Sequence, residues 1–251
     1  LFTDSVVTLF ESRRYSNTIN ANRITAYLQD TWKTNLDSTD IFISGGIRFH
    51  YWDYNKQPLF SPRASIAVVP NWEKDWLFRL SGGAYYQPPF FKEVFDKNGV
   101  ANPDIKAHES YHIVGGADYN FIAWRRPFKF VTEIYYKKLE NLIPYTVDNL
   151  RIIYEGDNLA HGYATGIDMK LTGEFVKGVD SWLSVSLLRS EEDLKNDVRI
   201  IENSDGSQSI SYPGYIPRPS AQNVTVNLFF QDYFPGNPTI KMHLNLVYGT
   251  G

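Results

Sequence analysis

The sequence predicts an all-β fold, an antiparallel up-and-down transmembrane β-barrel, from three observations. Side-chain polarity alternates with period two along most of the 251 residues, which is typical of strands with one apolar and one polar face. The links between the predicted strands alternate between short and long. Phe, Trp and Tyr make up 16% of the chain and gather near the strand ends, as they do at the two interfaces of a membrane barrel.

Ten predicted strands account for the alternation. In residues 108–121, for example, Ile113 and Phe121 share an apolar face, whereas His112 and Asp118 lie on the opposite face. No window of comparable length has the apolar spacing of a helix. The strands are expected near residues 22–34, 40–52, 63–70, 75–87, 108–121, 128–141, 161–175, 181–190, 221–231 and 239–248.

The links between these strands divide into two kinds that alternate along the chain. A membrane barrel has short periplasmic turns and long extracellular loops, so this alternation favours it over a soluble β-sandwich. A strand of about 12 residues is about 40 Å long, enough to cross the hydrocarbon layer at about 45° tilt. The short links are residues 35–39, 71–74, 122–127, 176–180 and 232–238, and the long ones are 53–62, 88–107, 142–160 and 191–220.

Composition excludes several functional classes. The chain has 25 Lys and Arg against 28 Asp and Glu, so it lacks the basic footprint of a nucleic-acid-binding protein. Hydrophobic residues make up 43% and charged residues 21%, which excludes a disordered chain. The absence of Cys excludes disulfides, thiolate metal sites and a Cys nucleophile. No run of 18 apolar residues predicts a membrane-spanning helix.

Catalysis and metal binding are not expected. His108, Glu109 and Ser110 are consecutive on a strand and point alternately to opposite faces, so they do not converge, and no GxSxG motif is present. His108 and His112 are about 13 Å apart on one strand, too far to share a metal ion. We therefore expect no catalytic residues, no metal site and no cofactor.

Several segments, in a consistent order, resemble the TonB-dependent outer-membrane transporters, in a form typical of Bacteroidetes. The resemblance implies a barrel of 22 strands with a plug domain in its lumen. Residues 1–251 would then form one partial outer-membrane barrel domain from the C-terminal part, with the plug and the remaining strands outside this sequence. The segments are YSNTINANRITAYLQDTW (15–32), GGIRFHYWDYN (45–55), SPRASIAVVP (61–70), FRLSGGAYYQPPFFKE (78–93), NPDIKAHESYHIVGGADYNF (102–121), TEIYYKKLENLIPY (132–145), NLAHGYATGIDMKLTGEF (158–175) and YGTG (248–251).

The resemblance implies active import of a nutrient across the Gram-negative outer membrane, driven by the proton motive force through an inner-membrane coupling complex. Siderophore, cobalamin, glycan and peptide all remain open as substrates. The implied partners are outer-membrane lipid, the protein's own plug domain and remaining strands, the TonB energy-coupling complex and a surface lipoprotein, with no nucleic acid. A structural or secretion-associated barrel and a barrel enzyme, either a protease or a lipase, are the alternatives.

Two sets of residues are the candidates for the functional surfaces. Strand alternation predicts that one set faces the lumen and the plug: Arg48, Arg63, Arg79, Asp118, Glu133, Lys137, Asp168, Lys170 and Glu174. The second set lies in or beside the long loops, where binding residues concentrate on rigid scaffolds. These candidates for ligand contact are Tyr85, Gln87, Phe90, Phe91, Tyr212 and Tyr215.

Overall fold

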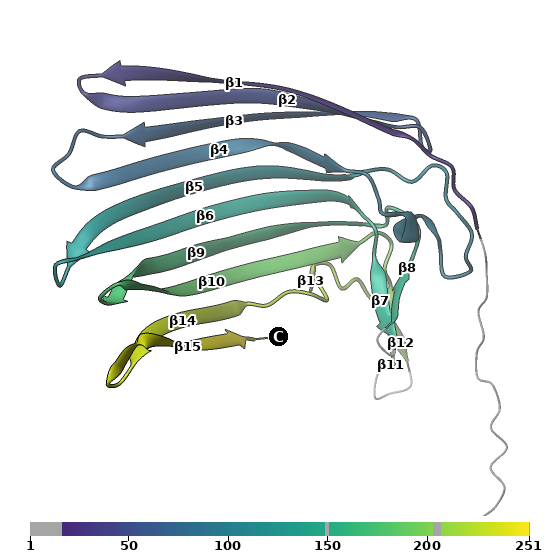
Figure 1. The fold of residues 1–251 in the computed structure, drawn as a ribbon. Coiled ribbons are helices and arrows are strands. Elements are labelled where there is room, and N and C mark those ends of the chain that lie inside the picture. The colour runs from purple at the N-terminus through teal and green to yellow at the C-terminus, as the bar shows by residue number, and fades with distance from the viewer. Residues whose placement is uncertain (1–16, 149–150, 203–206, 251) are drawn as a thin grey trace, which may run out of the picture.

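The protein forms one layer of long antiparallel strands, connected in sequence order (Figure 1). The computed structural model describes residues 17–148, 151–202 and 207–250. Within the described residues the sheet has eleven strands, of which ten long ones follow the order β1-β2-β3-β4-β5-β6-β9-β10-β14-β15 and a short one pairs beside β10. The ten long strands are β1 (Arg23–Leu36), β2 (Thr39–Trp52), β3 (Gln57–Val69), β4 (Asp75–Gln87), β5 (His108–Ala123), β6 (Arg126–Leu142), β9 (Ala160–Val176), β10 (Val179–Leu194), β14 (Val224–Phe234) and β15 (Asn237–Gly249).

All ten predicted long strands are present, with β14 lying three residues later than the predicted 221–231, and two strands, β3 and β10, are longer than predicted. β3 begins at Gln57, so the link expected over residues 53–62 is a turn over residues 53–56. β10 runs to Leu194, so the link expected from residue 191 begins later, and Glu191 and Glu192 are paired strand residues. Both errors come from polar or proline-containing stretches, in which the period-two signal is weak.

Proline explains why β3 was predicted too short. Pro62 lies inside the strand, opposite Ile47 of β2, although proline has no N–H to donate to a ladder. Its carbonyl oxygen points toward β4, because a Cβ added to Gly83 would come within 2.7 Å of it. The missing N–H lies on this same side, where pairing between β3 and β4 stops at Arg63 and Gly83. Pro62 therefore occupies a local edge, where proline is tolerated.

The turns that follow β1, β3, β5, β9 and β14 lie together at one end of the sheet, whereas the four-residue turn over residues 53–56, which was expected as a long link, lies at the opposite end (Figure 1). The turn between β1 and β2 consists of Asp37 and Ser38, with φ of 47° and 66°. The turn between β5 and β6 consists of Trp124 and Arg125, with φ of 51° and 61°. Two consecutive residues with positive φ are the geometry of the type I′ hairpin turn, whose twist matches that of the flanking strands.

The long links lie together at the opposite end of the sheet and contain structure that the sequence did not predict (Figure 1). A 3₁₀ turn, η1 (Phe91–Val94), lies in residues 88–107. Two short hairpins form, one from β7 (Tyr145–Asp148) and β8 (Arg151–Tyr154), the other from β11 (Arg199–Glu202) and β12 (Gln208–Ser211). β13 (Ile216–Pro217) pairs with the end of β10.

Burial is concentrated at this loop end. Trp52, Val94, Ile105 and Ile143 form a cluster in which every member is at most 5% exposed. Elsewhere both faces of the sheet are open, and every residue of β1 and β15 is exposed. Within the described residues, no helix is long and apolar enough to span a membrane.

Candidate functional site

Cross-strand register divides the sheet into an apolar face and a polar face. Residues directly opposite each other on paired strands lie on the same face. A continuous row on the apolar face crosses nine strands, and most of its side chains are exposed. From β1 to β14 the row is Trp32, Ile43, Ile66, Leu80, Gly115, Ile134, Ile167, Leu187 and Val224.

Aromatic rings border this apolar face at both of its ends. At the turn end, Trp76 stacks on Tyr119 with a centroid distance of 4.4 Å, and Phe121 and Phe128 continue the series at 5.6 Å. At the loop end, Tyr136 and Tyr163 are stacked at 6.3 Å. Phe128 and Tyr136 are eight residues apart on β6, about 27 Å along the strand, which at a tilt of about 45° spans about 19 Å of the about 25 Å apolar band of outer-membrane barrels.

The polar face carries all nine residues predicted to share it. Ladder pairing places eight of them there, and strand alternation along β9 adds Glu174. Glu174 lies at the turn end, where its carboxylate accepts a hydrogen bond of 3.2 Å from the N–H of Gly178. The sequence therefore predicted correctly which charged residues lie on one side of the sheet.

Four of the charged side chains on this polar face form an ion-pair network across β4, β5 and β6. The buried carboxylate of Asp118 lies 2.8 Å from Arg79 and 2.7 Å from Lys129. Arg79 also reaches Glu133 at 3.1 Å, across the intervening strand. Gly116 lies directly between Arg79 and Glu133 in the register, and a Cβ there would come within 3.2 Å of the Glu133 side chain. The glycine thus leaves the space that the crossing ion pair needs.

A second polar arrangement joins β6, β9 and β10. The Ser186 hydroxyl donates a hydrogen bond to Asp168. The Tyr135 ring lies across Gly166, because its hydroxyl oxygen would be 2.6 Å from a Cβ added there. Lys137 lies over the Tyr135 ring at 4.8 Å, and Lys170 lies over Trp182 at 5.1 Å. Each of these charged side chains therefore contacts a hydroxyl group or an aromatic ring of the same face.

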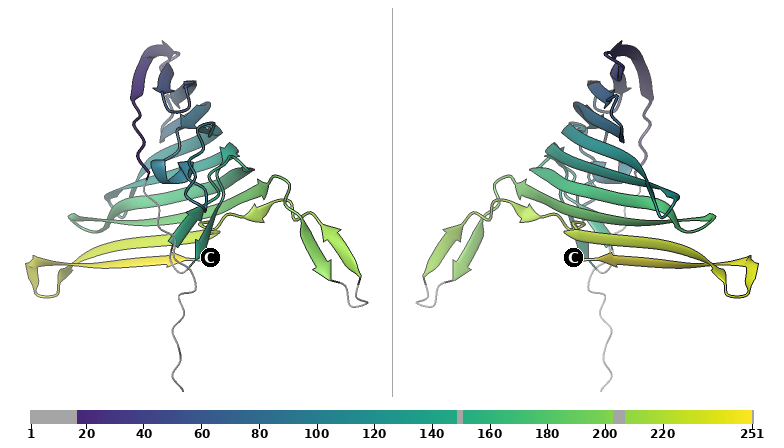
Figure 2. Two further views of the ribbon diagram at one scale, coloured as in Figure 1. Left: turned by 90° about the vertical axis from the view of Figure 1, so that its right-hand side faces the viewer. Right: turned by 90° about the vertical axis from the view of Figure 1, so that its left-hand side faces the viewer.

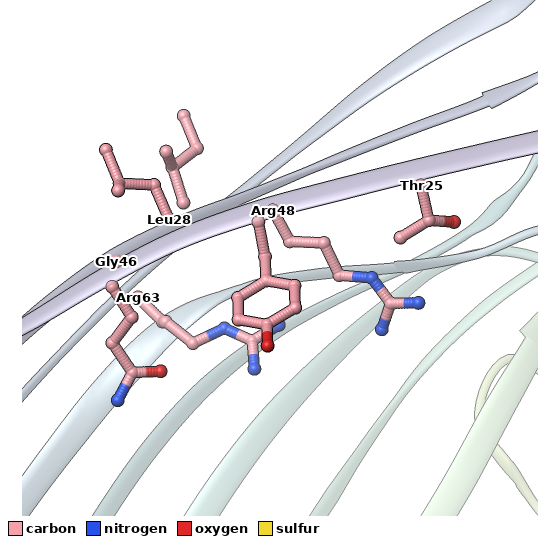
Figure 3. Close-up of a pocket in the computed structure, with 8 residues that line it drawn as sticks. Thr25, Leu28, Gly46, Arg48 and Arg63 are labelled. Carbon is pink, nitrogen blue, oxygen red and sulfur yellow. The ribbon is translucent and has the colours of Figure 1, made fainter.

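The polar face also holds a pocket between β1, β2 and β3. It is a cavity of about 390 Å³ whose lining includes Thr25, Tyr27, Gln29, Arg48 and Arg63. Both arginines extend from one side of the sheet, while Leu28 points to the opposite side (Figure 3).

The six candidates for ligand contact do not form one site. Tyr85 and Gln87 lie on the polar face at the loop end, where Tyr85 stacks on His112 at 4.3 Å. Tyr215 instead packs edge-on against Tyr163, a residue of the apolar face, at 5.3 Å. The remaining candidates, Phe90, Phe91 and Tyr212, have 54%, 49% and 75% of their surface exposed.

Asparagines hold the loops together in a way that the sequence analysis missed. The Asn158 side chain accepts a hydrogen bond of 2.7 Å from the N–H of Lys106 and donates one of 2.7 Å to the carbonyl of Asn141. Asn55 donates to the carbonyl of Ile105 at 2.7 Å. These bonds join segments far apart in sequence, so no local pattern predicts them.

Glu93 links the 3₁₀ turn to the start of β5. Its carboxylate accepts a hydrogen bond of 2.8 Å from the N–H of Phe90 and lies 3.7 Å from His108. Partial burial acts to raise the pKa of Glu93, but the nearby His108 side chain and the hydrogen bond from Phe90 outweigh it and lower the pKa below its usual value. In the described part of the chain, no three His, Asp or Glu side chains are arranged to hold a metal ion.

An apolar belt with aromatic borders, backed by a polar face of paired charges, defines this sheet as the wall of an outer-membrane β-barrel. Residues 2–248 match a family model described as TonB dependent receptor-like, beta-barrel, and the chain belongs to this family. Its members are β-barrels of the Gram-negative outer membrane that take part in TonB-coupled import, and they are transporters, not enzymes. No curated protein matches the sequence.

Proposed function

We propose that this chain forms ten strands of the barrel wall of a transporter that imports a nutrient, with the polar face toward the lumen and the apolar face toward lipid. The observation that carries the proposal is the exposed apolar row between two aromatic borders. Exposure of these apolar side chains to water would be unfavourable, whereas contact with the hydrocarbon of a membrane would be favourable. A siderophore, cobalamin, a glycan and a peptide remain the candidate substrates.

Open sheet edges support a larger barrel. All residues of β1 and β15 are exposed, and each strand has only one neighbour in the sheet. Unpaired backbone N–H and C=O groups are not tolerated in hydrocarbon. We infer that further strands complete a barrel that has 22 strands in total. These further strands and a plug domain would belong to polypeptide outside residues 1–251.

The two ends of the sheet fit different compartments. The end with short turns suits the periplasm, where the TonB energy-coupling complex would draw on the proton motive force, and the end with long links suits the cell exterior. A surface lipoprotein would contact this outer end. The mixed charges of the polar face suit contact with a plug domain, and the ring-rich loops suit the capture of ligand.

Surface labelling tests this orientation, because the sequence contains no Cys to give background. In the full-length transporter, a membrane-impermeant maleimide is expected to label Asn98→Cys on intact cells, since Asn98 lies exposed in the link between β4 and β5. Lys177→Cys, in the turn between β9 and β10, is expected to react only after the outer membrane is permeabilised. The reverse pattern would overturn the orientation, and labelling of both on intact cells would overturn the membrane barrel.

A further inference from the structure

The positively charged side chains of the polar face differ in whether they lie beside a carboxylate. Arg79 and Lys129, on β4 and β6, each lie within 3.1 Å of a carboxylate. On β2 and β3, Arg48 and Arg63 make no ion pair with any carboxylate of the described residues. Lys137 and Lys170 also have no carboxylate partner in the described part of the chain, but each lies over an aromatic ring, on β6 and β10 respectively. Within that part, Arg48 and Arg63 are therefore the two neighbouring arginines of this face without a counter-charge.

The two arginines are close enough to bind one group together. Arg63 lies directly opposite Gly46 in the register, and Arg48 is two residues farther along β2. Such diagonal positions on one face are about 7–8 Å apart at the backbone, within reach of long side chains. Both side chains line the same cavity of about 390 Å³ (Figure 3).

Arg63 is also held in a fixed orientation with an unused donor. Its guanidinium lies over the Tyr85 ring at 5.0 Å, which covers one face of the planar group and leaves the N–H edge available. The Nε atom of Arg63 is buried and has no hydrogen-bond partner within the described residues. Since neighbouring protein atoms cover Nε, the terminal N–H groups of Arg63 are the donors available to a group in the cavity.

Chemistry restricts what that group is. Two neighbouring guanidinium groups repel each other, and a shared anion removes the repulsion. Planar carboxylates accept paired hydrogen bonds from the guanidinium fork, and Tyr27, Gln29 and Thr25 line the same cavity with further polar groups. An apolar ligand or a cation would leave both guanidinium groups without a counter-charge.

We propose that Arg48 and Arg63 form a carboxylate-binding site on the inner wall of the barrel. The inference rests on the proposed assignment of this face to the lumen. Two sources supply this chemistry: an acidic side chain of the segment that fills the lumen, or a carboxylate of the imported ligand. In both cases the two arginines bind the same group, so the loss of one exposes the other.

Arginine modification of the purified full-length transporter tests the site. Phenylglyoxal reacts with free guanidinium groups, and mass spectrometry of peptides reports the rate at each position. Tricarballylate is the carboxylate probe. Arg189, which lies on the apolar face and is paired with Glu191 at 2.9 Å, serves as the internal reference. Lys33→Gln is the matched variant, because it removes one positive charge from the same face outside the pocket.

Each source gives its own result. If an imported ligand supplies the carboxylate, Arg48 and Arg63 react readily and tricarballylate slows both severalfold without slowing Arg189. If the lumen segment supplies it, both react slowly without the probe, and Arg63→Gln makes Arg48 react severalfold faster, whereas Lys33→Gln leaves Arg48 slow.

Two results would overturn the proposal. One is fast modification of both arginines that tricarballylate does not change. The other is slow modification of Arg48 that persists in Arg63→Gln, since this would show steric cover without a shared anion. Labelling of Asn98→Cys and Lys177→Cys reports the orientation independently, so a failed carboxylate site is distinguished from a failed barrel assignment.

Discussion

The two longest links at the loop end, residues 88–107 and 195–223, each contain three Pro, with three Phe in the first and two Tyr in the second, but they differ in packing. In the first, Val94, Ile105 and Ala107 are fully buried. The second projects away from the sheet as the β11–β12 hairpin, where Ile200 and Ile210 are 64% and 65% exposed (Figure 2). Two long links at the same end of the sheet therefore form a fixed rim in one place and an extended arm in the other.

Ring content alone therefore does not identify a ligand-binding loop. Phe91 packs against Trp52 at a centroid distance of 6.1 Å, with Arg23 lying over its ring at 5.1 Å, so it supports the rim. Tyr212, at the base of the hairpin, is 75% exposed. We expect the first link to control barrel stability and the second to control contact with ligand or partner.

Paired deletions give the largest expected effect. Removal of residues 92–101 takes out Val94 and the bridge between Phe95 and Ala101, so we expect little assembled barrel. Removal of residues 199–210 takes out a hairpin that pairs only with itself, so we expect normal barrel abundance with weaker uptake. The amount of heat-resistant barrel on gels measures assembly, and nutrient uptake by cells measures transport. Equal loss of barrel in both deletions would contradict the proposed difference between the two links.

The ring at the centre of the fixed rim provides a sharper test. Trp52 is 1% exposed and packs with Val94, Ile105 and Ile143, so Trp52→Ala is expected to destabilise the folded transporter by about 3–5 kcal/mol. Tyr212→Ala removes an exposed ring and is expected to cost less than about 0.5 kcal/mol. Urea unfolding of the purified protein measures both values, and a similar cost for the two substitutions would contradict the comparison.

Hydrogen bonds to one asparagine fasten the first link to its neighbour. Asn158→Ala leaves the N–H of Lys106 and the carbonyl of Asn141 without their partner, with an expected cost of about 1–3 kcal/mol. Gln208→Ala, on the projecting hairpin, is the control and is expected to be close to neutral. Faster amide exchange confined to residues 102–107 would confirm the fastening role, and unchanged exchange there would refute it.

The sequence predicted the sheet far better than the loops, for a physical reason. Period-two alternation is a local signal, and it placed Arg79, Asp118 and Glu133 on one face correctly. Which of these charges pair, and which glycine makes room for them, depends on neighbouring strands and on register. The Asn158 bonds join positions up to 52 residues apart, so no spacing rule reveals them.

Pro62 shows why the sequence also placed one strand boundary wrongly. Pro62 suggested the start of a strand because it removes a ladder donor, and this reasoning is sound for a strand paired on both sides. In the structure, the missing N–H of Pro62 would point toward β4, but β3 and β4 are paired only as far as Arg63 and Gly83. No hydrogen bond is therefore lost at Pro62, and β3 continues beyond it. The sequence contains the proline, but only the staggered pairing of three strands explains why it is tolerated.

The smallest expected effect concerns pH and again separates the two links. The pKa of Glu93 is lowered in the folded protein, so its ionised form favours folding. This contribution is fully present above the ordinary glutamate pKa of 4.5 and is lost as pH falls through the lower value of the folded state. Wild-type protein should therefore lose more stability than Glu93→Gln when acidified below pH 4.5, because the amide does not titrate.

Glu202→Gln, on the exposed β11 strand, should follow the wild-type pH profile closely. Urea midpoints measured at several pH values compare the three proteins, and a Glu93→Gln profile parallel to wild type would show that the carboxylate does not fasten the 3₁₀ turn to β5.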